Sequence, residues 1–218
     1  FRQGQVTTCP CNDRKPIVAS NGFSLRIMIS LSEIKDVLNN ANREFLEQLA
    51  QEARKTTRQY FGRTISLYTP LYLSNHCSSH CTYCGFHSHH RIKRFKLTAE
   101  QIRREMAYLA NCGIEQILLL TGESYKATPL SYLKEAVDIA KDYFSSISLE
   151  IHPMETEEYR ELFIAGVDGI TIYQETYNPQ RYKEVHLAGK KADYDYRFAA
   201  PQRAADGGIR HLSMGILL

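Results

Sequence analysis

The sequence lacks a long apolar run, and it lacks a marked excess of either charge. No stretch is long enough to cross a membrane as a helix, and the first residues contain no secretory hydrophobic segment. Lys and Arg number 27 against 24 for Asp and Glu, and the net charge of +3 is too small to indicate nucleic-acid binding. Solenoid-length repeats and low-complexity linkers are also absent. We therefore expect a cytoplasmic globular protein without a membrane or nucleic-acid partner.

The length allows one domain or part of a larger barrel. The 218 residues are 43% apolar, which is enough for a buried core. Residues 1–40 are predicted to be an irregular N-terminal segment, and residues 41–218 to form the main domain. Cys9 and Cys11 form a CxC pattern that could bind metal, although an exposed terminal segment explains it more simply. Because the chain opens on Phe1 instead of Met, we expect its start to be trimmed or incomplete.

Three of the six cysteines fall within eight residues, as Cys77, Cys81 and Cys84. Three thiols this close cannot all pair as disulfides, so the spacing favours a metal or a cluster in a reducing compartment. Zinc prefers four ligands in structural sites. A fourth ligand could come from one of the nearby histidines: His76, His80, His87, His89 or His90. A [4Fe–4S] cluster is normally held by thiolates, and three of them leave one iron open to a substrate or cofactor.

Short apolar runs alternate with amphipathic helical segments through the main domain. The runs predict five strands, over residues 65–73, 117–120, 147–151, 169–173 and 211–218. A helix precedes them at 42–61, and others are predicted over 98–112, 128–140, 156–165 and 197–205. This alternation indicates βαβ units and a parallel sheet. The predicted fold is α/β, a partial (β/α) TIM-type barrel that is truncated after about five strands.

The second predicted strand and the helix before it give two further expectations. The all-apolar run 117–120 is typical of a strand buried on both faces, as in a parallel sheet. Cys112, at the C-terminal turn of the helix 98–112, is expected to be a small buried apolar residue.

The chemistry of such barrels lies at the C-terminal ends of the strands. This rule selects the cysteine loop after the first strand, residues 121–123 after the second, and residues 173–177 after the fourth. Glu150 and His152 on the third strand are expected to point into the barrel, although Glu150 could equally pair with a neighbouring cation.

The segment that follows the cysteines is basic. Residues 91–96 could follow a phosphate backbone, but we expect a solvated connection or a docking surface for an electron donor. The histidines at 87, 89 and 90 are expected to be exposed and unligated.

The CxxxCxxC pattern, with Tyr83 before its third cysteine and on the loop after a first barrel strand, resembles the radical SAM enzymes. The resemblance extends to the 2-iminoacetate synthases, the tyrosine lyases of thiamine biosynthesis, and covers residues 45–218. The segments that carry it are 71–75, 81–86, 91–94, 118–123 and 173–177. Members of that family are longer, and their C-terminal part is not found in this sequence.

The resemblance implies two cofactors, a [4Fe–4S] cluster and S-adenosyl-L-methionine. Cys77, Cys81 and Cys84 would ligate the cluster, and the remaining iron would bind the amino and carboxylate groups of S-adenosylmethionine. In that family the reduced cluster cleaves the sulfonium and generates a 5′-deoxyadenosyl radical. Tyr83 would lie against the adenine.

The resemblance also implies contacts to the other parts of S-adenosylmethionine. Gly122 and Glu123 would meet the methionine amino group, in a segment where Thr121 replaces the family's first glycine. By similarity to biotin synthase, Glu175 would hold the ribose hydroxyls and Arg197 would lie near the methionine carboxylate. These residue types suit those groups, since carboxylates accept from ammonium and diol donors and a guanidinium donates to a carboxylate.

The implied reaction is cleavage of the Cα–Cβ bond of L-tyrosine to 2-iminoacetate (dehydroglycine) and p-cresol. The implied partners are thiazole synthase and, as electron donor, reduced flavodoxin or ferredoxin. The residues that bind tyrosine are expected beyond Leu218. Two alternatives stay open: the tyrosine lyase of [FeFe]-hydrogenase cofactor maturation, and a non-catalytic module that binds zinc or an iron–sulfur cluster.

Overall fold

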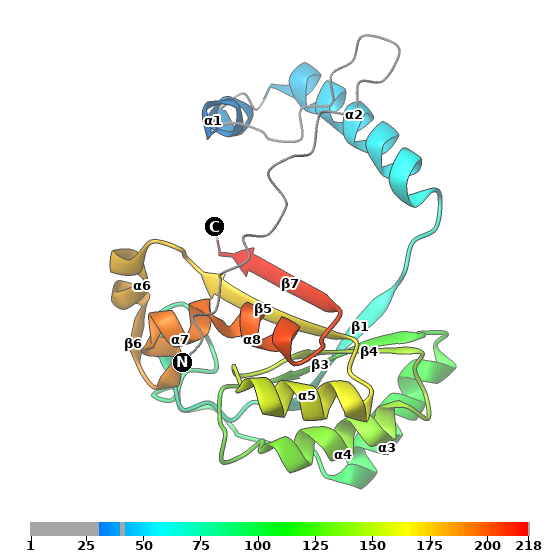
Figure 1. Cartoon of the computed structure of the whole chain (residues 1–218), viewed down its shortest axis with the longest axis vertical. Coiled ribbons are helices and arrows are strands. Elements are labelled where there is room, and N and C mark those ends of the chain that lie inside the picture. The colour runs from blue at the N-terminus through cyan, green and yellow to red at the C-terminus, as the bar shows by residue number, and fades with distance from the viewer. Residues whose placement is uncertain (1–30, 40–41, 218) are drawn as a thin grey trace, which may run out of the picture. The chain divides into compact units, whose positions relative to one another are not determined.

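The computed structural model describes residues 31–39 and 42–217 (Figure 1). The chain divides into two units, Phe1–Thr64 and Ile65–Leu218. The predicted boundary between residues 40 and 41 lies outside the described residues, as do Cys9 and Cys11. None of the helices in the described ranges combines the length and the apolar character needed to span a membrane.

The described part of the first unit is helical. Helix α1 spans Leu31–Asn39 and α2 spans Arg43–Phe61, which confirms the predicted helix at 42–61. The Asn42 side chain accepts a hydrogen bond from the Phe45 amide at 2.8 Å and so caps the start of α2. None of the residues of α2 is buried.

The second unit is built on a parallel sheet whose strands follow the order β1-β3-β4-β5-β7. These are the five predicted strands. Their bounds are Tyr68–Ser74, Gln116–Thr121, Ser146–Glu150, Gly169–Glu175 and His211–Ile216. Strand β1 begins three residues later than predicted. The sequential order of parallel strands is the arrangement expected of a partial (β/α) barrel.

Helices cover one face of this sheet (Figure 1). They are α3 (Ala99–Asn111), α4 (Leu130–Ala140), α5 (Thr156–Ala165) and α8 (Ala200–Asp206). Alternate strand residues such as Ile117, Leu119 and Leu149 pack with the helices in the main core. The other face is more polar, because Ser146, Ser148, Thr171 and Ser213 line it together with Leu118. The prediction that residues 117–120 are buried on both faces was therefore wrong, since Leu118 is only half-buried.

Several helix ends differ from the predictions. The Thr98–Gln101 capping box of α3 is confirmed, with both reciprocal bonds formed. Helix α4 starts after Pro129, because the Thr128 hydroxyl donates to the Ser124 carbonyl instead of capping the helix. Glu155 precedes α5 as its cap in place of Thr156. Cys112 is exposed, contrary to prediction, because it lies beyond the last residue of α3.

The predicted helix at 197–205 is two helices. Helix α7 spans Tyr194–Phe198, and α8 begins at Ala200 with Pro201 in its first turn. Proline has no amide hydrogen to continue a preceding helix, so the break falls at this position.

No helix or strand was predicted for residues 178–192, which contain three short elements. They are α6 (Pro179–Val185), β6 (His186–Ala188) and the 3-10 helix η2 (Lys190–Ala192). Strand β6 pairs antiparallel with β2, which consists of His80 and Cys81. This small ladder ties the cysteine loop to the segment after β5.

Candidate functional site

A cavity of about 220 Å³ lies at the C-terminal ends of β1, β3, β4 and β5. All the residues predicted to hold the cluster or S-adenosylmethionine line it. They are Cys77, Cys81, Tyr83, Cys84, Gly122, Glu123, Glu175 and Arg197. The structure thus brings together residues that are more than 100 positions apart, and it leaves their individual roles as predictions.

The cysteine loop is held by the turn that follows β3. The Ser78 amide and hydroxyl both donate to the Glu123 carbonyl oxygen, at 2.9 and 2.8 Å. The Gly122 amide donates to the Ser74 carbonyl at 3.0 Å. A Cβ on Gly122 would overlap the carbonyl oxygen of His76. Glycine is therefore required at position 122 by the cysteine loop itself, whatever ligand the cavity takes.

Arg94 fixes the outer part of the loop. Its guanidinium donates to four carbonyl oxygens: those of Asn75, Phe86, His87 and His90, at 2.6 to 3.2 Å. A planar guanidinium has enough donors in one fork to serve such a set. The prediction of a solvated segment or docking surface at 91–96 is therefore wrong for Arg94, which is built into the loop.

Glu123 and Arg197 form a buried ion pair. Arg197 Nη1 donates to Glu123 Oε1, and Arg197 Nε donates to the Tyr173 carbonyl at 2.7 Å. The two side chains are 11% and 7% exposed. Ser79 Oγ donates to the other carboxylate oxygen of Glu123 at 3.4 Å. Arg197 is thus part of the cavity wall and is not a surface helix charge.

Glu175 turns into the cavity through an unusual backbone. Its φ is +69°, which places a non-glycine residue in the left-handed region, and the β5–β7 register shifts between Tyr173 and Glu175. Such strain is concentrated at functional sites. Lys191 Nζ lies 2.8 Å from Glu175 Oε1, with both side chains 13% exposed.

Tyr83 and Glu150 also face the cavity. The Tyr83 hydroxyl lies 2.7 Å from His186 Nε2, a contact that holds the phenol ring. Burial, together with the nearby charge of Glu175, raises the pKa of Glu150. His152 does not line the cavity, contrary to prediction. It is buried with its ring centroid 3.9 Å from that of Tyr125.

The donor set of the loop indicates what it can hold. Among residues 31–39 and 42–217, three histidines are the group of potential ligands that lie close enough together to hold one ion. Within the same residues, the three thiols of the loop form no such group. Burial raises the pKa of Cys77, and it raises that of Cys81 to about 11. The thiols of Cys77 and Cys81 are therefore protonated until a metal displaces their protons. Thiols that line one cavity without converging on a point suit a multi-iron cluster better than a single zinc ion.

Sequence reasoning missed several residues that line the cavity. Tyr72 and Phe86 form an edge-to-face pair with centroids 5.6 Å apart, and Ser79 and Lys191 contact the two carboxylates. No pattern in the sequence pointed to Lys191 directly. The Asn178–Pro179 dipeptide, a helix N-cap and first-turn pattern, would have identified α6 and the segment after it.

The comparisons agree on one family and on partial coverage. Residues 71–218 match the radical SAM superfamily. The chain is 41% identical over 190 residues to the 2-iminoacetate synthase of Escherichia coli K12, covering 87% of this chain and 50% of that enzyme. It is 28% identical over 160 residues to the 3-methylornithine synthase of Methanosarcina barkeri, covering 72% and 45%.

A solved structure of the FeFe-hydrogenase maturase HydG from Carboxydothermus hydrogenoformans is also similar. It matches with a TM-score of 0.79 and 32% identity, over 86% of this chain and 44% of that one. The chain spans about half the length of the curated relatives it matches.

Proposed function

The chain belongs to the radical SAM superfamily, and we propose that it takes part in cleaving the Cα–Cβ bond of L-tyrosine to 2-iminoacetate and p-cresol for thiazole and thiamine biosynthesis. The identity to a 2-iminoacetate synthase supports this choice within the superfamily. The observation that carries the proposal is the cavity itself, which Cys77, Cys81 and Cys84 line together with three glutamates and a buried guanidinium.

Members of the superfamily use a [4Fe–4S] cluster and S-adenosylmethionine. The thiols fit the cluster, because they line one cavity without converging on a single ion. Cys77, Cys81 and Cys84 would hold it, and together with S-adenosylmethionine it supplies hydrogen-atom abstraction from carbon. The contacts of Gly122, Ser78 and Arg94 hold the cysteine loop, and with it the three thiols, in place.

The Glu123–Arg197 pair is suited to an amino acid group. A zwitterion carries an ammonium and a carboxylate close together, and the pair presents a carboxylate and a guanidinium side by side. Glu123 would accept from the ammonium, and Arg197 would donate to the carboxylate. Because both side chains are held by other bonds, little reorganisation is needed on binding.

The remaining wall suits a nucleoside. Glu175 is a carboxylate that can accept two hydrogen bonds from a ribose diol, and Tyr83 offers an aromatic face fixed by His186. Tyr72 and Phe86 supply apolar surface to the same cavity and would help to exclude water.

The product determines the partners. An imine such as 2-iminoacetate hydrolyses readily, so direct transfer to thiazole synthase would protect it. A reduced flavodoxin or ferredoxin would supply the electron.

A second candidate is the tyrosine lyase of [FeFe]-hydrogenase maturation. The similarity to HydG over 86% of this chain favours it specifically. The higher identity to 2-iminoacetate synthase favours the thiamine reaction.

The proposal is tested by an anaerobic assay of the full-length protein with S-adenosylmethionine, a reductant and L-tyrosine. We expect 5′-deoxyadenosine and p-cresol from the wild type and from Cys112→Ser, and neither product from Cys84→Ser. Deoxyadenosine without p-cresol would reject tyrosine as substrate. A fully loaded cluster with neither product would reject radical SAM chemistry for this protein.

A further inference from the structure

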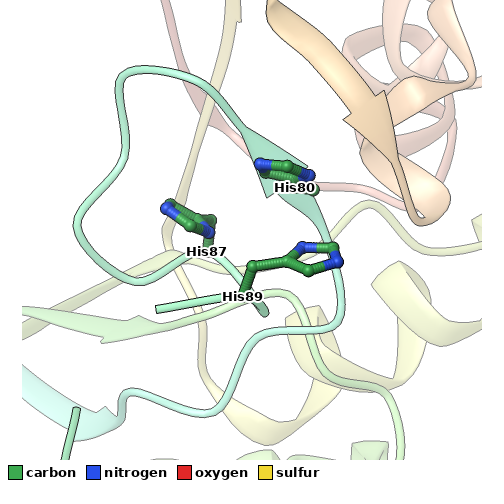
Figure 2. A group of neighbouring side chains, drawn as sticks. All are labelled: His80, His87 and His89. Carbon is green, nitrogen blue, oxygen red and sulfur yellow. The ribbon is translucent and has the colours of Figure 1, made fainter. Parts of the chain in front are cut away.

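Three histidines on the outer side of the cysteine loop face one another (Figure 2). His80 lies on β2, and His87 and His89 lie in the turn after Cys84. One ring nitrogen from each lies within 4.8 Å of the other two. His80 does not line the cavity that its neighbour Cys81 lines, as expected where successive side chains point to opposite faces of a strand.

The backbone holds these rings together without any ion. The Ser88 amide, between His87 and His89, donates to the Ser79 carbonyl at 2.8 Å, which joins the turn to the start of β2. Arg94 Nη2 donates to the His87 carbonyl at 2.8 Å. The ring centroids of His80 and His89 are 4.2 Å apart, and those of His80 and His87 are 4.8 Å apart. The trio is therefore brought together by the fold.

One ring nitrogen in this group has no partner. Within the described residues, His87 Nδ1 is enclosed and makes no hydrogen bond. An enclosed polar atom left unpaired costs stability, and an ion in its neighbourhood is one of the few explanations for such an atom.

We propose that His80, His87 and His89 bind one divalent transition metal ion, best represented by Zn²⁺, at a site separate from the cysteine cavity. No carboxylate or thiol belongs to the group, and an all-imidazole set selects zinc, copper or nickel over magnesium or calcium. At a Zn–N distance of about 2.1 Å in a tetrahedral site, two nitrogens on one ion lie about 3.4 Å apart. Small side-chain rotations would therefore close the site, and water would take the fourth position.

An ion at this place would act on the cysteine loop. It would link β2, which contains Cys81, to the turn that follows Cys84. Because the ligands converge only in the folded chain, binding would raise the stability of this loop. The site does not depend on the proposed reaction, and it differs from the expectation that His87 and His89 are unligated.

The test uses the full chain after anaerobic reconstitution, so that iron and sulfide occupy the thiols. Equilibrium dialysis against Zn²⁺ with metal analysis would measure binding, and zinc K-edge absorption would identify the ligands. We expect one Zn²⁺ per chain with a nitrogen shell and imidazole scattering. Loss of a hydrogen-bond partner of a metal ligand weakens metal binding by roughly 10–100-fold. Loss of the ligand itself, in His80→Ala, His87→Ala or His89→Ala, should weaken zinc binding by at least as much.

The matched control is His211→Ala, an exposed histidine at the start of β7, which should bind zinc as the wild type does. His89 is itself exposed, so His89→Ala should keep its fold, which circular dichroism would verify. Sulfur in the zinc shell would place the ion on the cysteines and overturn the proposal. Equal zinc binding by the three variants and the control, or none by the wild type, would overturn it as well.

Discussion

Two carboxylates of the cavity have cationic partners from the same chain. Glu123 pairs with Arg197, and Glu175 pairs with Lys191. Away from water, each member of such a pair is tolerated because of the other's charge. At the scale of single residues, these four charges cancel one another, and Glu150 is the third carboxyl group of the cavity.

Removing one member of the buried pair should leave the other as an uncompensated buried charge. We expect Arg197→Met to lower the free energy of unfolding by about 3–5 kcal/mol. The double variant with Glu123→Gln should lose clearly less than the sum of the two single losses. Urea unfolding of the four proteins measures this coupling.

The exposed pair of Arg181 and Glu184, with the same type of contact at 2.8 Å, is the control. Its coupling should be about 0–1 kcal/mol. Additive losses at Glu123 and Arg197 would contradict the account.

His152 should make the fold sensitive to mild acid. Burial lowers its pKa to about 4, whereas the unfolded chain binds the proton near pH 6.5. The stabilising contribution is complete above pH 6.5 and is lost as the pH falls toward 4, by up to about 3 kcal/mol. His152→Gln should show a flatter fall in the free energy of unfolding across this range, and His211→Gln should follow the wild type. Parallel curves for all three proteins would show that His152 does not titrate in this way.

At the scale of elements, the cysteine loop is positioned by contacts from several segments. Strand β6 pairs with β2, and Arg94 donates to four carbonyl oxygens. Gly189 has a φ of +84°, and a Cβ added to it would lie only 2.5 Å from Ser79 Cα. The loop is therefore shaped by the fold around it before any metal binds.

Gly122→Ala should displace the cysteine loop, since the added methyl group would overlap the His76 carbonyl oxygen. We expect iron and sulfide loading after anaerobic reconstitution to fall severalfold. Gly85→Ala lies on the same loop but has open space around it, so it should load normally. Equal loading of the two variants would mean that the loop does not depend on the turn after β3.

The elements differed in how far the sequence could predict them. Five strands and the helices between them were predicted because their apolar residues recur with a clear period. Helix α6, β6 and η2 are too short for a period, so Lys191 was missed with them. The burial of Arg197 depends on Glu123, which lies 74 residues away, and local pattern holds no information about such a contact.

At the scale of the whole molecule, the second unit is built on one open parallel sheet with helices on one face and the cavity at its C-terminal edge. Fold class and site position followed from strand–helix alternation and from the rule that barrel chemistry lies at that edge. The sequence did not predict that the second face of the sheet is more polar. The run 117–120 is entirely apolar, and this composition does not indicate whether helices cover one face of the strand or both.

The central claim is that Cys77, Cys81 and Cys84 hold a [4Fe–4S] cluster in the cavity that binds S-adenosylmethionine. The most direct measurement is iron and sulfide analysis after anaerobic reconstitution, followed by electron paramagnetic resonance of the reduced protein with and without S-adenosylmethionine. We predict about four iron and four sulfide per chain for the wild type and Cys112→Ser, with a spectrum that S-adenosylmethionine changes. Serine at 77, 81 or 84 should abolish or sharply reduce loading. Full loading in those variants, or a spectrum that S-adenosylmethionine leaves unchanged, would contradict the account.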